Sequence, residues 1–146
     1  MKLLPSKYDK SSLDELFHEG TMPEPAALAG EWRVDMLTGI VPSMYRLNHR
    51  KVIEIGSGGG IFGSNVLFRD AKWGYFYVEK IFGRAFGFDD RPALLIDYNR
   101  TINGEMSRNL RDYVRCLAPG LFLGRFCYQF GSRLIFLGYF TLAKID

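Results

Sequence analysis

The sequence predicts a mainly β protein: one barrel or sandwich of short antiparallel strands, preceded by one short helix. Three observations support this fold class. Turn signals recur about every 8–12 residues after residue 50, helical periodicity is missing from the same stretch, and aromatic residues make up 15% of the 146 residues. Aromatic side chains suit pleated, half-buried surfaces better than helices. A chain of this length is expected to form a single domain, 1–146, with its own core.

The N-terminal part predicts a loose arm over 1–10 and an amphipathic helix over 11–19. Ser12 and Glu15 fit a capping box, in which Ser12 is the N-cap and Glu15 occupies N3. Apolar residues follow at helical spacing, and Gly20 ends the run. We expect this helix to pack on the body of the fold.

About seven to nine short strands are expected, separated by turns that contain Gly, Pro or Asn-Gly. The candidate segments are 27–37, 51–55, 61–68, 73–82, 93–98, 110–117, 121–130 and 134–144. One helical turn is expected over 42–48. Several strands are apolar on both faces, whereas a sheet with one wet face shows a polar residue at every second position. Both faces should therefore be covered, by the helix, by a second subunit in a homodimer, or by an apolar ligand inside.

Composition excludes several classes of function. The net charge is +3, and the arginines are spread along the chain instead of forming the patch typical of a nucleic-acid binder. Cys116 and Cys127 lie in apolar runs and are expected to be buried free thiols. His18 and His49 are isolated, so no metal or other cofactor is expected. The first residues lack the apolar region of a signal peptide, and no apolar run reaches the length of a membrane span; a cytoplasmic protein is the default expectation.

The run KVIEIGSGGGIFG, residues 51–63, has two interpretations. Residues 58–63 match G-x-G-x-x-G, residues 51–60 resemble the first motif of the S-adenosylmethionine-dependent methyltransferases, and Glu79 stands where a ribose-binding acid belongs. A nucleotide-binding loop spanning Gly56 to Gly63 would follow. However, the 83 residues after Gly63 carry hairpin turns instead of crossover helices. We therefore favour a strand and a flexible turn, placed at the mouth of a barrel as a gate.

The second half carries a resemblance. The segments RPALLIDY, RDYVRCLAPGLFLGRFCYQF and RLIFLGYFTLAK, within 89–142, are similar to a largely uncharacterised family of small bacterial proteins. The family pattern is of the type RPALxxDY, RDxxRxxxPGLxLG and YFxL. This sequence departs from it at Tyr113, where the pattern has an acid, and at Asp90, where it has Gly. The resemblance implies a lipocalin-like, calycin-type up-and-down β-barrel and no particular activity.

Gly30-Glu31-Trp32 adds to this resemblance. Lipocalins carry G-x-W on the first strand, and their Trp closes the barrel base beneath a basic residue from the last strand. Trp32, with Arg125 or Lys144, is expected to take those parts.

Asp97 is the sharpest candidate site residue. It follows the apolar run 94–96, where an unpaired carboxylate is costly to bury, so a partner is expected. Arg111, Arg115 and Arg125 are the candidate partners, at the floor of a cavity. Arg111 and Asp112 are adjacent, so one of them must point inward. Hydroxyl groups for the same cavity are expected from Tyr75, Tyr77 and Tyr98, and Trp32 completes the predicted ligand-binding set.

These observations support a barrel that binds a small, mainly apolar molecule, with Asp97 and an arginine orienting its polar end. Three alternatives stay open. The barrel is an enzyme that uses Asp97 or a tyrosine as general base; the chain is a methyltransferase-like nucleotide binder; or the apolar surface serves homodimerisation without a ligand.

Overall fold

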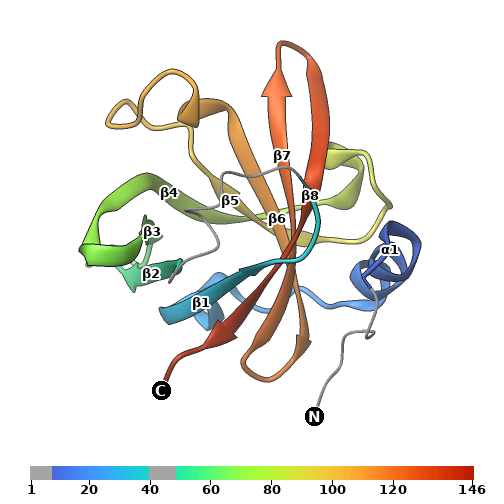
Figure 1. Ribbon diagram of the computed structural model, residues 1–146, viewed down its shortest axis with the longest axis horizontal. Helices are drawn as coiled ribbons and strands as arrows, with labels where there is room; N and C mark the ends of the chain where they lie inside the picture. Colours follow the sequence, from blue (N-terminus) through green and yellow to red (C-terminus); the bar gives the residue numbers. More distant parts are fainter. Residues whose placement is uncertain (1–7, 40–48) are drawn as a thin grey trace.

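A computed structural model of the chain describes residues 8–39 and 49–146. Eight antiparallel strands close into a barrel, each paired with the next along the chain, and β8 returns to β1 (Figure 1). The strands are β1 Gly30–Met36, β2 Arg50–Ile55, β3 Ile61–Val66, β4 Lys72–Ile81, β5 Ala93–Asp97, β6 Leu110–Ala118, β7 Leu121–Phe130 and β8 Arg133–Lys144. The predicted mainly β, up-and-down barrel is confirmed. The helical turn expected over 42–48 lies outside the described residues.

The barrel interior is a packed apolar core at one end. Alternate residues of each strand point inward, so that Leu94 and Ile96 of β5 join the interior cluster while Leu95 joins a second cluster outside. Trp32 closes the base, and its ring meets that of Phe122 edge to face, with 5.3 Å between centroids. The core therefore fills the base and leaves the other end for a pocket.

Helix α1 (Lys10–Glu19) covers part of the outer face, over β6 and β7 (Figure 1). Leu13 and Phe17 of the helix are fully buried in the outer cluster. This cover explains why the strands beneath are apolar on both faces. The predicted helix is confirmed, but its cap differs: Asp9 is the N-cap, and its carboxylate accepts from the backbone N–H of Ser12 at 2.8 Å. Short 3-10 turns lie at Pro25–Leu28, Phe68–Asp70, Gly83–Phe86 and Ser107–Asn109.

The glycine-rich run is a hairpin turn, so the nucleotide-binding interpretation is wrong. Residues 56–60 join β2 to β3, which pairs antiparallel to it, where a dinucleotide loop would open a helix. Gly59 has a φ of +85°, a conformation that favours glycine, and Glu79 is exposed on the outside of the barrel. The turn is also not a gate, because β2 begins beside the pocket and carries the chain to the opposite end.

Candidate functional site

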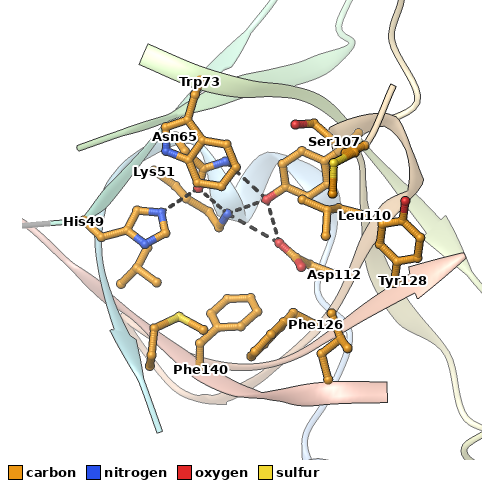
Figure 2. Close-up of a pocket in the computed structure, with 15 residues that line it drawn as sticks. His49, Lys51, Asn65, Trp73, Ser107, Leu110, Asp112, Phe126, Tyr128 and Phe140 are labelled. Atoms are coloured by element: carbon orange, nitrogen blue, oxygen red, sulfur yellow. Dashed lines mark hydrogen bonds and ion pairs between the residues drawn. The ribbon is translucent and has the colours of Figure 1, made fainter. Parts of the chain in front are cut away.

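A pocket of about 370 Å³ enters the barrel at the end opposite Trp32. Figure 2 shows the side chains that line it. Most of its wall is apolar, and a few polar side chains converge at its inner end. The lining residues are Val34, Met36, His49, Lys51, Asn65, Trp73, Tyr98, Met106, Ser107, Leu110, Asp112, Phe126, Tyr128, Leu137 and Phe140. Small-molecule sites typically combine such an apolar wall with a small number of polar groups.

A break in strand alternation brings Trp73 into this wall. On β4, Phe76 and Val78 point inward, so Trp73 would face outward in a regular strand. Gly74 has a φ of +58°, and the β3–β4 register shifts between Gly63 and Asn65. This bulge turns the indole inward, where its ring lies 5.9 Å from that of His49.

Lys51 is the centre of the polar cluster. The residue is 2% exposed, and its ammonium group donates to Asn65 Oδ1 at 2.7 Å and to the Tyr98 hydroxyl at 2.6 Å. A third partner is Asp112 Oδ2, at 3.4 Å. The ammonium also lies 5.3 Å from the ring centre of Phe76 and 5.7 Å from that of Phe140. The barrel wall therefore surrounds this cation with oxygen atoms and aromatic faces.

The remaining hydrogen bonds fix the orientation of the cluster. The Tyr98 hydroxyl donates to Asp112 Oδ2 at 2.7 Å. Asn65 Nδ2 donates to the carbonyl of Gly74, which only accepts, so the amide orientation is set. Asn65 Oδ1 must then accept from His49 Nε2 at 2.8 Å, which places a proton on that nitrogen. The cluster thus links four strands through a chain of directed hydrogen bonds.

Burial dominates the electrostatics of the cluster. Loss of water lowers the pKa of Lys51, although the nearby Asp112 charge opposes the shift. Burial likewise raises the pKa of Asp112, against the opposing effects of Lys51 and Tyr98. The pKa of Tyr98 is raised well above its usual value by burial and by the Asp112 charge. We infer that the two charges are retained as a pair because each is the main group that offsets the desolvation of the other.

Of the predicted ligand-binding residues, Tyr98 lines the pocket and Trp32 lies beneath it at the base. The indole Nε1 of Trp32 donates to the carbonyl of Leu28 at 2.8 Å. The ammonium group of Lys144, from β8, lies 4.8 Å from the centre of the Trp32 ring. The expected basic residue above the tryptophan is therefore Lys144 and not Arg125.

Asp97 lies on the outside of the barrel, which corrects its expected place at the cavity floor. Its carboxylate is 3.4 Å from the Arg111 guanidinium, so the predicted pairing exists, but the side chain of Asp97 is 29% exposed. Strand β5 is apolar on both faces, and the pattern alone does not tell which face is inner. The expectation that one of Arg111 and Asp112 points inward is confirmed, and the inward residue is Asp112.

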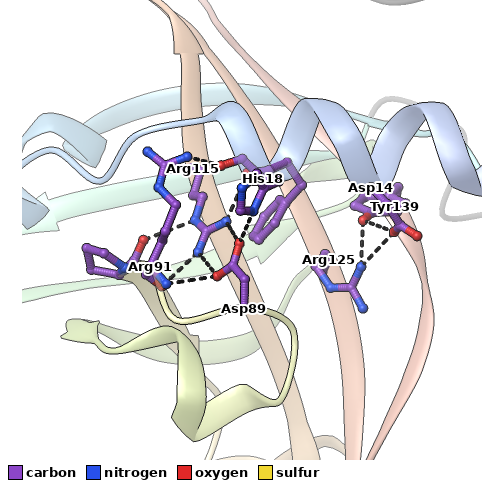
Figure 3. Close-up of polar contacts among 9 residues, drawn as sticks. Asp14, His18, Asp89, Arg91, Arg115, Arg125 and Tyr139 are labelled. Atoms are coloured by element: carbon purple, nitrogen blue, oxygen red, sulfur yellow. Dashed lines mark hydrogen bonds and ion pairs between the residues drawn. The ribbon is translucent and has the colours of Figure 1, made fainter.

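Arg115 also lies outside the barrel, beneath α1 (Figure 3). It is fully buried and holds Asp89 through two hydrogen bonds of 2.8 and 2.6 Å. It further donates to three backbone carbonyls, those of Phe17, Arg91 and Pro92. This arginine therefore fastens the helix to the loop before β5.

Arg125 makes a second polar connection between the helix and the outside of the barrel. It donates to Asp14 of the helix at 3.0 Å and also to the hydroxyl of Tyr139 (Figure 3). Neither Arg115 nor Arg125 lines the pocket, because both belong to the outward-facing positions of β6 and β7.

Tyr75 and Tyr77 lie on the outer face of β4. Tyr77 is 53% exposed, and the guanidinium of Arg100 stacks 4.4 Å from its ring centre. The structure thus separates both tyrosines from the cavity.

Four polar residues of the buried cluster were not in the predicted ligand-binding set: Lys51, Asn65, Asp112 and His49. Lys51 opens an apolar strand, where a lysine is normally a solvated end residue, and Asn65 lies in a segment that resembles a weak helix as much as a strand. The alternation of β6, which places Asp112 opposite Arg111, was the one usable signal. Within residues 8–39 and 49–146, no group of three or more potential metal ligands is found, and no helix is long and apolar enough to cross a membrane.

Comparison with known proteins gives a fold likeness only. No family model and no curated protein matches the chain. A crystal structure of a protein from Thermomonospora curvata superposes with a TM-score of 0.58, covering 96% of this chain and 90% of that one. The two sequences are 14% identical, so the likeness concerns the barrel architecture.

Proposed function

We propose that this protein binds a small, mainly apolar molecule inside its barrel. The observation that carries the proposal is the pocket of about 370 Å³, whose apolar wall ends in the buried Lys51–Asp112 cluster. Its volume falls in the range of roughly 300–1,000 Å³ typical of small-molecule sites. A buried ion pair contributes little net stability compared with apolar residues of similar volume, so the cluster is better explained by recognition than by folding.

The proposal includes a relationship to lipocalin-like barrels. The closed up-and-down topology and the pairing of Lys144 with Trp32 both support it. An enzymatic role for Asp97 receives no support, because its carboxylate lies on the outer surface and has no access to the pocket.

The direct test is titration with N-phenyl-1-naphthylamine, an uncharged dye that fluoresces in apolar surroundings. We expect saturable binding of one dye per chain. Leu110→Trp, which fills the pocket from a lining position, should weaken binding at least tenfold, about 1.4 kcal/mol.

Ile55→Trp provides the matched control. Ile55 is 55% exposed at the end of β2 away from the pocket, so the added indole should leave dye affinity unchanged. Equal affinities for the two variants, or no saturable binding to the wild-type protein, would contradict the proposal.

A further inference from the structure

We propose that the ligand carries a hydrogen-bond donor, a hydroxyl or amine on an apolar skeleton, and that Asp112 Oδ1 accepts from it. This inference rests on the proposed function and names the chemical class of the ligand. The hydrogen-bonding positions of the buried cluster that are already occupied limit which groups a ligand can offer.

The charge and most donors of Lys51 are already engaged. Of the three donors of its ammonium group, two hydrogen-bond to Asn65 Oδ1 and to the Tyr98 hydroxyl, and the ion-pair partner Asp112 Oδ2 lies 3.4 Å from the nitrogen. Its charge is also balanced by the Asp112 carboxylate. A ligand carboxylate would therefore meet a neutral pair and a second buried anion, and would lose its water without gaining a free cation.

Asp112 retains one free acceptor. Tyr98 and Lys51 both approach Oδ2, while no described residue donates to Oδ1. The side chain reaches into the pocket from β6, beside Leu110 and Phe126 (Figure 2). Asp112 is 5% exposed, and Oδ1 is the carboxylate oxygen that stays open to the pocket, so a donor supplied by the ligand would satisfy it without breaking an existing bond.

The surrounding wall sets the rest of the ligand. Apolar side chains line the pocket between its outer end and the cluster, and the remaining polar groups there, Ser107 and Tyr128, lie toward the loop and hairpin end. A skeleton with a single donor at its inner tip and apolar carbon along its length fits this distribution.

The test uses three probes with one naphthalene skeleton: 2-naphthol, 2-methoxynaphthalene and 2-naphthoate. Each is measured by displacement of N-phenyl-1-naphthylamine from the purified protein. We expect 2-naphthol to bind at least tenfold more tightly than 2-methoxynaphthalene, which lacks the donor, and 2-naphthoate to bind most weakly.

Asp112→Asn should remove the first preference. The amide oxygen would keep the hydrogen bond from Tyr98 and the contact with Lys51, and the NH₂ group would face the pocket, where it can donate to the oxygen of 2-naphthol and of 2-methoxynaphthalene alike. Asp97→Asn is the matched control: it removes an aspartate that also lies 3.4 Å from its cation, but outside the barrel, and should change no preference.

The outcomes separate the two proposals. If the dye does not bind, the proposed function fails. If the dye binds but no probe displaces it, if the three probes bind equally, or if 2-naphthoate binds best, the cavity is functional and the assignment of a donor ligand is overturned. The ranking in the wild-type protein decides this even if Asp112→Asn does not fold.

Discussion

Two aspartate–cation pairs occupy the two sides of the same barrel wall. Asp112 faces Lys51 inside, and Asp89 faces Arg115 outside, beneath the helix. Burial opposes ionisation of both carboxyls, yet the pKa of Asp112 is raised and that of Asp89 is lowered to about 2. Two causes separate them: Asp112 is the more deeply buried, which raises its pKa, and Asp89 receives hydrogen bonds from Arg115, from His18 and from the backbone of Arg91, which lower its pKa.

The cations differ in the same way. Arg115 bonds three backbone carbonyls besides its carboxylate, whereas Lys51 bonds only side chains. The outer pair is therefore part of how the helix and loop satisfy their backbone groups. The inner pair satisfies no backbone group and leaves one carboxylate oxygen open to the pocket. An ion pair with complete partners therefore belongs to the fold, whereas one with an open position belongs to the site.

The largest expected effect is on the free energy of unfolding, when the outer pair is replaced by apolar residues. The same replacement of the inner pair is the comparison. Arg115→Met with Asp89→Leu should lower the free energy of unfolding by about 3 kcal/mol or more, because three backbone carbonyls beneath the helix lose their donors. The unfolding free energy of Lys51→Met with Asp112→Leu should stay within about 1 kcal/mol of that of the wild type. Lys51→Met alone should cost about 3 kcal/mol, because it leaves a buried carboxylate without its cation. Urea denaturation measures all three variants. Equal losses of unfolding free energy in the two double variants would contradict the distinction between the inner and the outer pair.

A smaller effect is expected from acid. The folded-state pKa of Asp89, about 2, lies below its usual value of 3.8. Its stabilisation is therefore complete above pH 3.8 and is lost as the pH falls from there through about 2, a loss of roughly 2 kcal/mol. Asp112 changes the stability in the opposite direction. Its pKa is raised, so its protonation in acid removes the cost of burying a charge and favours the folded state. Unfolding free energies of the wild type and Asp89→Asn should converge over this window; parallel curves would show that Asp89 does not contribute.

The smallest effect is expected at the glycine turn. Gly59→Ala places a side chain at a φ of +85°, with no atom within 4 Å of the new Cβ, so only the backbone conformation opposes it. A loss of about 1 kcal/mol follows, with dye affinity unchanged. Weaker dye binding in this variant would indicate that the turn has a functional role.

Much of the fold could be predicted because the signals for each strand are local in the sequence. The turns at Pro119-Gly120 and Gly131-Ser132 and the alternation of the flanking strands lie within a few residues of one another. The site could not be predicted in the same way. Lys51, Tyr98 and Asp112 meet only after the barrel closes, and strands that are apolar on both faces do not reveal which side is inner. Asp97 was therefore assigned to the wrong face, while Tyr98, the next residue, lies in the pocket.

If the proposal holds, the inner pair recognises the ligand and the outer pair maintains the fold. The most direct measurement is the ratio of dissociation constants, 2-methoxynaphthalene over 2-naphthol, for the wild type, for Lys51→Met with Asp112→Leu, and for Asp89→Asn. The inner double variant suits this test because it is expected to remain stable. We predict a ratio of about ten or more for the wild type and Asp89→Asn, and about one for the inner double variant. An undiminished ratio in the inner double variant would contradict the claim.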